Sequence, residues 1–404
     1  MLILKIAWRN IFRQKRRTFL TVLTMFGGFT LSAISIGWSD GTYNNIISMF
    51  TRNRLGHIQI HERDYLDKPS MHKNIPNYRE IGTELMEMED VEAWTPRFYA
   101  AGLTSVGEKS SGARVIGIDP ALESKATNFQ KKITKGNTLS DAAANQAVLG
   151  KGLAETLKAA PGDTVLIFSQ AADGSLANDL YEIVGILESG NTADDRSSLY
   201  LHLQDAQNLF VLDTAVHEIA VIATGLDEVE DLAESIETTL NNPDLNVETW
   251  KEFARSFYVA MKADKQGAWI SLFVIILIVA TGVLNTVLMT VLERRREYGV
   301  LRAVGTQPFQ VFKLVIYEVE SMALVSIAAG VLISLIVNHL LSINGLPMPE
   351  TYTYGGMEFS RFYSEVSLRG ILIPAVTIAF TAFIVGIFPA YKASQVEPAK
   401  AMRL

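Results

Sequence analysis

Four long apolar runs constrain this sequence more than any other feature. They cover residues 18–38, 267–292, 314–341 and 370–390. The first, second and fourth contain no Asp, Glu, Lys or Arg, whereas the third carries Glu318 and Glu320 near one end, where we expect the membrane interface. About 20 apolar residues suffice to cross the hydrocarbon core of a bilayer. A soluble domain can bury one such run, but four of them predict an integral membrane α-helical protein with four transmembrane helices.

The basic residues predict how these helices are oriented. Three segments, 1–17, 293–313 and 391–404, hold 14 of the 36 Lys and Arg residues but only 3 of the 43 Asp and Glu residues. Loops rich in Lys and Arg stay in the cytoplasm, and four spans place these three segments on one side. We therefore expect both termini in the cytoplasm of a multi-pass protein of the inner (plasma) membrane. The segments 39–266 and 342–369 are then extracytoplasmic (periplasmic).

The N-terminal segment suggests a helix on the inner membrane surface. Lys5, Arg9 and Arg13 recur every four residues in the segment 1–17, and apolar residues occupy another face. Such a pattern is typical of an amphipathic helix whose cations meet anionic headgroups. A cleaved secretory signal is the alternative, but the apolar run 18–38 exceeds the usual 7–15 residues. We expect an uncleaved anchor.

The large segment 39–266 predicts an α+β domain between the first and second spans. Alternating or β-branched runs predict strands, and longer periodic runs predict helices, with the last helix and strand giving a β-α-β order. Residues 39–53 and 250–266 lack Pro and predict helical stalks that continue the spans. The expected strands are 55–61, 113–118, 163–168, 181–187, 217–224 and 245–250, and the expected helices are 146–160 and 226–242.

No constellation of residues in the sequence predicts catalysis. The chain has no Cys, and its one Gly-Lys pair, Gly150-Lys151, lacks the surroundings of a phosphate-binding loop. His57 and His61 share one face of an expected strand, where they suit either a metal ion or, more commonly, a solvated polar face. We therefore expect a non-catalytic chain without a metal or cofactor of its own, and the acidic outer segment argues against a nucleic-acid partner.

The charged stretch ERRREYGVLRAVG, residues 293–305, predicts a short helix between the second and third spans. Glu293 can reach Arg296, or Glu297 can reach Arg294, at helical spacing. The same pattern gives a narrow apolar stripe, and the segment ends at a glycine followed by a new helix start. The stripe consists of Tyr298, Leu301 and Val304. This helix suits docking in the groove of a partner protein, although the charges alone would also serve to fix topology.

The same stretch resembles the signature of the FtsX/MacB-type permeases of ABC transporters. AWRNIFRQKRRT at 7–18 and FPAYKASQVEPAKAMRL at 388–404 also look like that family, so the resemblance covers the whole chain. GHIQIHERDY at 56–65 resembles the lipoprotein-releasing (Lol) branch of this family. The chain length and the absence of an ATPase signature also fit that branch.

The resemblance implies a particular assembly. Two permease subunits, as a homodimer or with a sister permease, would bind two copies of a cytosolic ABC ATPase, which would hold the ATP and Mg²⁺. Small residues in the first span, Gly27, Gly28 and Ser32, suit close helix packing at the dimer contact or within one subunit. The residues expected to couple to the ATPase are Glu293, Arg294, Arg295, Glu297, Tyr298, Gly299, Leu301, Arg302 and Gly305.

The function implied by the resemblance is mechanotransmission. ATP hydrolysis in the partner would move the periplasmic domain, which would release lipoproteins from the inner membrane, with membrane lipid, lipoprotein and a periplasmic acceptor as further partners. Two alternatives remain open at this point. One is MacB-like export of a peptide, toxin or small amphiphile, and the other is FtsX-like regulation of a periplasmic hydrolase.

Overall fold

The computed structural model describes residues 7, 9, 10, 15–354 and 357–398. Most of the amphipathic helix expected at 1–17 lies outside the described residues. The chain divides into two compact units. We call residues 1–45, 261–348 and 361–404 the helical unit, and residues 46–260 and 349–360 the sheet unit.

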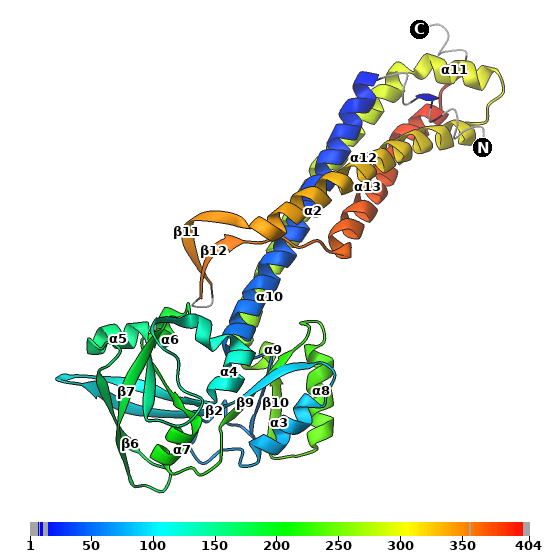
Figure 1. The fold of residues 1–404 in the computed structure, drawn as a ribbon. Coiled ribbons are helices and arrows are strands. Elements are labelled where there is room, and N and C mark those ends of the chain that lie inside the picture. The colour runs from blue at the N-terminus through cyan, green and yellow to red at the C-terminus, as the bar shows by residue number, and fades with distance from the viewer. Residues whose placement is uncertain (1–6, 8, 11–14, 355–356, 399–404) are drawn as a thin grey trace. The chain divides into compact units, whose positions relative to one another are not determined.

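Four long helices build the helical unit (Figure 1). Each is long and apolar enough to cross a membrane, which confirms the predicted fold class. A short helix, α11 (Arg295–Ala303), joins the second of them to the third. Helices α2 and α10 each contribute residues to both units. The four are α2 (Lys15–Phe50), α10 (Arg255–Glu293), α12 (Pro308–Asn344) and α13 (Leu368–Ser394).

Small residues allow these helices to pack closely. A Cβ on Gly330 of α12 would collide with the ring of Phe29 on α2. Ser326 Oγ donates a hydrogen bond to the Val22 carbonyl of α2 at 3.0 Å, and Asn338 Nδ2 donates to the Ala33 carbonyl at 3.2 Å. These two polar side chains inside the apolar bundle are thus satisfied by a neighbouring helix, as packing in lipid favours.

Two of the three small residues predicted to lie at a dimer contact pack inside the chain instead. Gly28 and Ser32 are buried within the chain itself, and a Cβ on Gly28 would collide with Val279 of α10. Their assignment to a dimer contact is therefore corrected to packing inside one subunit. Gly27 has no atom within 4 Å of the position of an added Cβ, so its role at a subunit contact stays a prediction.

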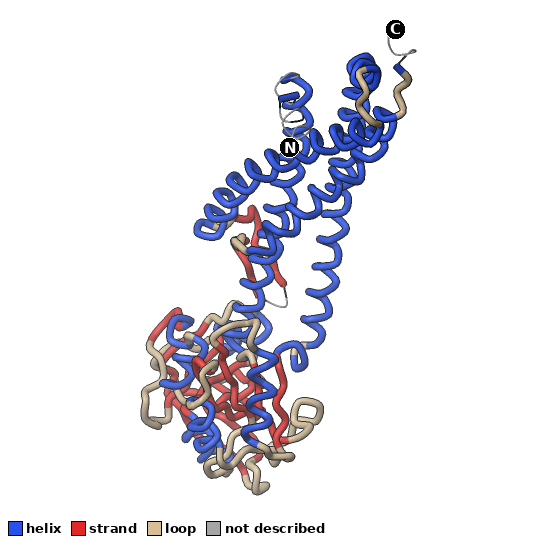
Figure 2. Tube along the Cα trace, turned by 90° about the vertical axis from the view of Figure 1, so that its right-hand side faces the viewer, coloured by secondary structure: helices blue, strands red, loops and turns tan. Residues whose placement is uncertain are grey.

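A ten-stranded, mostly antiparallel sheet forms the sheet unit (Figure 2). The strand order is β10-β1-β9-β2-β3-β8-β5-β7-β4, and β6 pairs with both β2 and β7. The strands are β1 (Ile58–Glu62), β2 (Val91–Val106), β3 (Lys109–Ile118), β4 (Ile133–Gly136), β5 (Gln146–Gly150), β6 (Thr164–Gln170), β7 (Leu176–Leu187), β8 (Ser198–His202), β9 (Glu218–Ala223) and β10 (Leu245–Thr249).

Short helices connect the strands and cover the sheet. Asp119 begins α4 by accepting hydrogen bonds from the backbone N–H groups of Ala121 and Leu122, both at 3.0 Å. The helices are η1 (Thr51–Leu55), α3 (Tyr78–Met86), α4 (Pro120–Thr127), η2 (Phe129–Lys132), α5 (Lys151–Leu157), α6 (Thr192–Asp195), α7 (Leu203–Phe210), α8 (Val229–Leu240) and α9 (Trp250–Phe253).

The structure corrects the reading of His57 and His61 as a solvated polar face. Strand β1 lies between β10 and β9, and both histidines are buried, 3% and 1% exposed. His57 Nδ1 accepts a hydrogen bond from the Ala223 N–H at 3.0 Å, and His61 Nε2 lies 3.3 Å from Glu218 Oε2. Among the described residues, no group of three or more potential metal ligands gathers.

Two other segments differ from their sequence patterns. QAVLG, expected as the start of a helix over 146–160, is strand β5, and only Lys151–Leu157 is helical. The expected loop 342–369 contains a hairpin of β11 (Leu346–Tyr354) and β12 (Met357–Phe362). Tyr354 of this hairpin lies edge-on to Phe257, with ring centroids 5.6 Å apart. Both of these rings belong to the sheet unit.

Candidate functional site

The predicted connector forms α11, with clear signals at both ends. Gly305 has a φ of 103°, a conformation that a residue with a Cβ adopts only with strain, and the Thr306 N–H donates to the Leu301 carbonyl at 3.1 Å. Helix α12 follows at once, because Pro308 occupies its first turn and Gln310 Oε1 accepts from the Gln307 N–H at 3.0 Å. The turn between the two helices is therefore short and conformationally fixed.

Arg294 holds this connector to the third long helix. Its Nη1 lies 3.0 and 2.8 Å from the two carboxylate oxygens of Glu318 on α12, and its Nε donates to Glu297 Oε2 at 2.9 Å. The guanidinium also lies over the ring of Tyr298, 5.3 Å from its centroid. The pairing of Glu297 with Arg294, one of two predicted alternatives, is thus the one found.

Asn10 and Arg17 contact two residues at the same place. Asn10 Nδ2 donates to Glu318 Oε1 at 2.6 Å, and Arg17 forms an ion pair with Glu293, the last residue of α10. Asn10 and Arg17 thereby contact α12 and α10, the two long helices that α11 joins. We call this set, Asn10, Arg17, Glu293, Arg294, Glu297, Tyr298 and Glu318, the joint.

The centre of the joint is removed from solvent. Arg294 and Glu318 are 8% and 7% exposed, and Tyr298 is fully buried. Burial raises the pKa of Tyr298, so its phenol stays neutral. Burial alone would lower the pKa of Arg294, but the carboxylates of Glu318 and Glu297 outweigh it and hold that pKa above its ordinary value. A buried pair of this kind tolerates the loss of one partner poorly, because the other charge is left uncompensated.

A small cavity of about 30 Å³ lies within the joint, lined by residues that include Arg17, Thr290, Arg294 and Tyr298. The Tyr298 hydroxyl has no hydrogen-bond partner among the described residues. A cavity of this size with several polar neighbours can hold ordered water, which would satisfy the hydroxyl.

The nine residues expected to couple to an ATPase divide into an inner and an outer set. Arg294, Tyr298 and Gly299 are buried, and Leu301 packs against the apolar core of the helical unit. The predicted docking stripe is therefore corrected, because Tyr298 and Leu301 face their own chain. The outer set is exposed or half-exposed and consists of Glu293, Arg295, Glu297, Arg302 and Gly305.

A different apolar pair faces outward on α11. Val300 is 47% exposed and Val304 is 83% exposed, and their spacing of four residues puts them on one face of the helix. Arg295, Arg296 and Ala303 are exposed beside them, and Phe309 at the start of α12 is 61% exposed. We call Arg295, Arg296, Val300, Ala303, Val304 and Phe309 the connector surface.

Sequence reasoning missed Glu318 as the partner of Arg294. A signal was present, because an ionisable residue inside an otherwise apolar segment commonly pairs with another charge. The partner was not deducible from spacing, since 24 residues separate the two. Asn10, 308 residues from Glu318, could be found only from the fold.

Comparison with known proteins matches both parts of the chain. The model of the MacB-like periplasmic core domain matches residues 18–239, more than half of the chain. The model of the FtsX-like permease C-terminal region matches residues 269–398, which include the whole connector.

Individual relatives agree with these matches. The chain is 21% identical to the lipoprotein-releasing system transmembrane protein LolC of Neisseria meningitidis serogroup B, over 98% of each chain. It is 23% identical to the pyoverdine export ATP-binding/permease protein PvdT of Pseudomonas syringae pv. syringae, over 99% of this chain and 59% of that protein. Among solved structures, the periplasmic region of MacB from Actinobacillus actinomycetemcomitans has 16% identity and a TM-score of 0.37, over 49% of this chain and 91% of that one.

Proposed function

Because the chain belongs to the family with a MacB-like periplasmic core domain and is a permease subunit of an ABC transporter, we propose that it releases lipoproteins from the inner membrane by using ATP that a separate subunit hydrolyses. It is a non-catalytic, multi-pass protein of the inner membrane. In the proposal, two permease subunits and two ATPase subunits form the transporter.

The observation that carries this proposal is the division of α11 into a buried and an exposed face. The buried face is fixed by Arg294 to α12 and by Tyr298 to the core of the helical unit. A force applied to the exposed face would therefore act on α10, α11 and α12 together and would not bend a loop. The connector surface, with Val300 and Val304 between arginines, is where we place the ATPase.

The comparisons support a partner ATPase. PvdT is named as an ATP-binding/permease protein, and this chain corresponds to only 59% of its length. Among the described residues, the Gly150-Lys151 pair lies at the junction of β5 and α5 and does not form a phosphate-binding loop. We infer that an ABC ATPase works together with the permease part described here.

The likeness to LolC supports lipoproteins as cargo, since it extends over 98% of both chains. Export of a small amphiphile is the second candidate, and the likeness to PvdT, named for pyoverdine export, favours it. A lipoprotein and a small amphiphile differ in size and in how they are attached to the membrane, so transport assays separate them.

The proposed orientation places the connector and both termini in the cytoplasm. It rests on the basic residues of 1–17, 293–313 and 391–404. A second observation supports the number of spans: residues 349–360, from the short loop between the third and fourth spans, cluster with residues 46–260 in the sheet unit. Four spans put these two segments on the same side of the membrane.

The direct test is co-purification with a lone ABC ATPase from the same genome. The tagged chain should retain this ATPase, and added lipoprotein should raise the rate of ATP hydrolysis. The double variant Val300→Asp/Val304→Asp should lose the ATPase, because two carboxylates would be buried without partners at the contact. Both side chains are exposed in the chain itself, so the fold should survive.

A matched control uses an exposed apolar residue of the sheet unit. Leu176, 62% exposed on β7, can be changed to Asp without touching the connector surface, and Leu176→Asp should retain the ATPase. If Val300→Asp/Val304→Asp keeps the ATPase and its stimulation at wild-type levels, the connector surface is not the docking site. If a hydrophobic export substrate stimulates hydrolysis and lipoprotein does not, the cargo assignment is wrong.

A further inference from the structure

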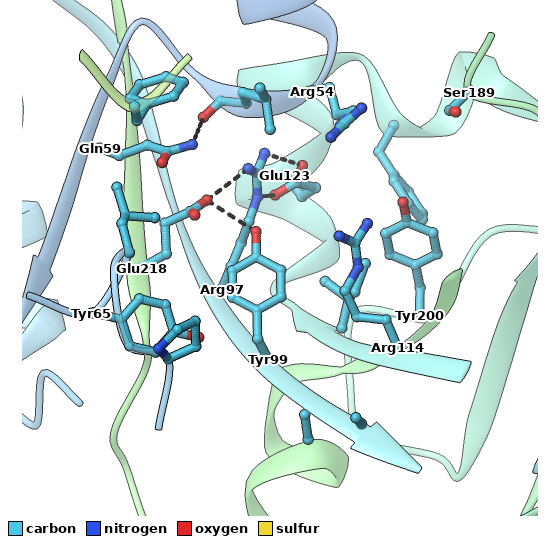
Figure 3. Close-up of a pocket in the computed structure, with 18 of the residues that line it drawn as sticks. Arg54, Gln59, Tyr65, Arg97, Tyr99, Arg114, Glu123, Ser189, Tyr200 and Glu218 are labelled. Carbon is cyan, nitrogen blue, oxygen red and sulfur yellow. Dashed lines mark hydrogen bonds and ion pairs between the residues drawn. The ribbon is translucent and has the colours of Figure 1, made fainter. Parts of the chain in front are cut away.

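A cavity of about 590 Å³ opens on one face of the large sheet, entirely within the sheet unit (Figure 3). Its size lies within the range typical of pockets for small ligands. The floor comes from neighbouring strands β2, β3 and β8, and the walls come from η1, α4, η2 and the segment 65–71 that follows β1.

The alternation of strand residues explains why this floor carries charge. Arg97, Tyr99 and Ala101 of β2 point to the same face, because successive side chains of a strand alternate. Across the sheet, Tyr99 is paired with Ile116 of β3, and Ile116 is paired with Tyr200 of β8. Arg114 is paired with Ala101 and stands next to that row. The sheet therefore presents two arginines and two tyrosines to one hollow.

The first of these arginines is already neutralised. Arg97 forms two hydrogen bonds with Glu123, at 2.8 and 3.0 Å, and one with Glu218 at 2.9 Å. Tyr99 Oη donates to the same oxygen of Glu218 at 3.1 Å. Burial alone would raise the pKa values of Glu123 and Glu218, but Arg97 and hydrogen bonds outweigh it and hold both pKa values below the usual range. This network is a rigid, fully paired wall.

The opposite side of the cavity has more positive than negative charge. Arg54 and Arg114 both pair with the single carboxylate of Asp194, with Arg114 Nη2 at 3.1 Å. Lys132 of η2 lines the same cavity, and burial lowers its pKa to about 8. The Arg114 Nε–H is buried and has no acceptor among the described residues. In Figure 3 the side chains of Arg54 and Arg114 lie on the side of Arg97 that faces Tyr200.

The remaining lining is mostly aromatic or apolar. Tyr65, Phe129 and Tyr200 contribute rings, and the rings of Phe129 and Tyr200 meet edge to face at 5.1 Å. Leu187 and Ile116 close the apolar part. Such a lining suits an apolar or aromatic body, while the cations suit an anionic group.

The sign of the charge in the cavity is unusual for its surroundings. Residues 39–266 carry 20 basic and 35 acidic side chains, yet the cavity is lined by four cations, Arg54, Arg97, Arg114 and Lys132, and by two carboxylates. A cationic hollow in an acidic domain focuses attraction for anions at one place.

We propose that this cavity binds a small amphipathic anion, in which a carboxylate or phosphate group is attached to an apolar or aromatic body. The anionic group lies between Arg54, Arg114 and Lys132 and accepts from the Arg114 Nε–H. The body lies against Tyr65, Phe129 and Tyr200. This site is independent of the connector surface, and its occupancy is measured without ATP or cargo.

The test is calorimetric titration of the purified full-length chain, in a detergent with an uncharged headgroup, with phenyl phosphate as the probe. We expect saturable binding at one site with a Kd of about 1 mM or tighter. Phenol, which lacks the anion, should bind at least about tenfold more weakly, and so should inorganic phosphate, which lacks the ring. Arg114→Gln and Lys132→Gln should each weaken phenyl phosphate by about tenfold.

Lys109→Gln is the matched control, because Lys109 is an exposed lysine at the start of β3 that does not line the cavity. It should bind phenyl phosphate as the wild type does. Thermal unfolding of each variant without probe establishes that the fold is intact. Absence of saturable binding to the wild type, or equal binding by Arg114→Gln, Lys132→Gln and Lys109→Gln, would overturn the proposal.

A second arm identifies the source of the anion. The titration is repeated in nanodiscs of phosphatidylcholine and in nanodiscs that also contain phosphatidylglycerol. If phosphatidylglycerol weakens the binding of phenyl phosphate to the wild type but not to Arg114→Gln, the site binds a lipid phosphate. Unchanged binding of phenyl phosphate assigns it to a soluble anion. Either result is compatible with the proposed site, because this arm follows only if phenyl phosphate binds saturably.

Discussion

At the scale of single residues, the buried charge of Arg294 is the feature with the largest consequence. It contacts Glu297 and Glu318 and lies over Tyr298, so three other side chains depend on one guanidinium. Removing one member of a buried ion pair costs far more than the pair itself contributes, whereas replacing both members by apolar groups can be neutral. The joint is therefore best tested by comparing single and double variants.

We expect Arg294→Met to destabilise the chain by roughly 3 kcal/mol, because Glu318 is then buried without its cation. The double variant Arg294→Met/Glu318→Leu should recover most of that loss. Thermal unfolding in detergent measures both. A double variant no more stable than Arg294→Met would show that the charge on Glu318 is compensated in another way.

Two histidines make the sheet unit sensitive to acid. Burial lowers the pKa values of His57 and His217 to about 4, and each accepts a backbone N–H through Nδ1, from Ala223 and Tyr99 respectively, at 3.0 Å. In the unfolded chain a histidine takes up a proton near its ordinary pKa of about 6.5. Because only the unfolded state binds this proton between about pH 6.5 and pH 4, stability falls as the pH falls through that window.

The double variant His57→Asn/His217→Asn should lose less stability on acidification, since an amide oxygen can accept the same N–H but cannot be protonated there. The expected difference is about 1.4 kcal/mol per histidine at about pH 5.5, relative to neutral pH. Unfolding midpoints of wild type and variant at the two pH values provide the measurement. Parallel losses in both proteins would mean that other groups cause the acid sensitivity.

At the scale of elements, hydropathy predicted the long helices well and the sheet only partly. An uncharged run of 20 residues has few structural options, which is why α2, α10, α12 and α13 each contain an expected span. QAVLG was read as helix because a short apolar run carries no clear period, and its partners β7 and β8 come later in the chain. Strand β2 was missed entirely, since Pro96, Arg97 and Gly102 interrupt its pattern.

The site was predictable to a similar degree. ERRREYGVLRAVG predicted α11 and the glycine that ends it. Spacing could not show which face of α11 is buried, because the contact between Arg294 and Glu318 depends on the fold. The charged cavity of the sheet unit was also hidden. Its cations, Arg54, Arg114 and Lys132, come from three separate elements. They line one cavity only in the folded chain, where β2, β3 and β8 pair.

The two neighbouring glycines of α2 offer a matched pair of tests. Gly28→Leu should destabilise the helical unit by about 1–3 kcal/mol, because the new side chain would collide with Val279. Gly27→Leu should leave the stability of the fold unchanged, since space is open there. Thermal unfolding of both variants decides between them. If Gly27→Leu also weakens subunit association in chemical cross-linking, Gly27 lies at the dimer contact; equal destabilisation by both would contradict the packing described for α2.

At the scale of the whole molecule, the distribution of charge predicts which side of the membrane each part occupies. The chain contains no Cys, so single cysteines can be introduced into a silent background. We expect Leu176→Cys to react with a membrane-impermeant maleimide in spheroplasts, and Val304→Cys to react only after the membrane is permeabilised. Both positions are exposed in the chain itself, so its own packing does not limit either reaction. Labelling of Val304→Cys in unbroken spheroplasts would reverse the proposed topology.

The central claim is that the connector surface passes the work of an ATPase to the release of a lipoprotein. The most direct measurement is ATP-dependent transfer of a fluorescent lipoprotein out of proteoliposomes that contain the permease and the ATPase. Wild type and Leu176→Asp should transfer lipoprotein only when ATP is present, whereas Val300→Asp/Val304→Asp should transfer none. ATP-dependent transfer by Val300→Asp/Val304→Asp at the wild-type rate would contradict the account.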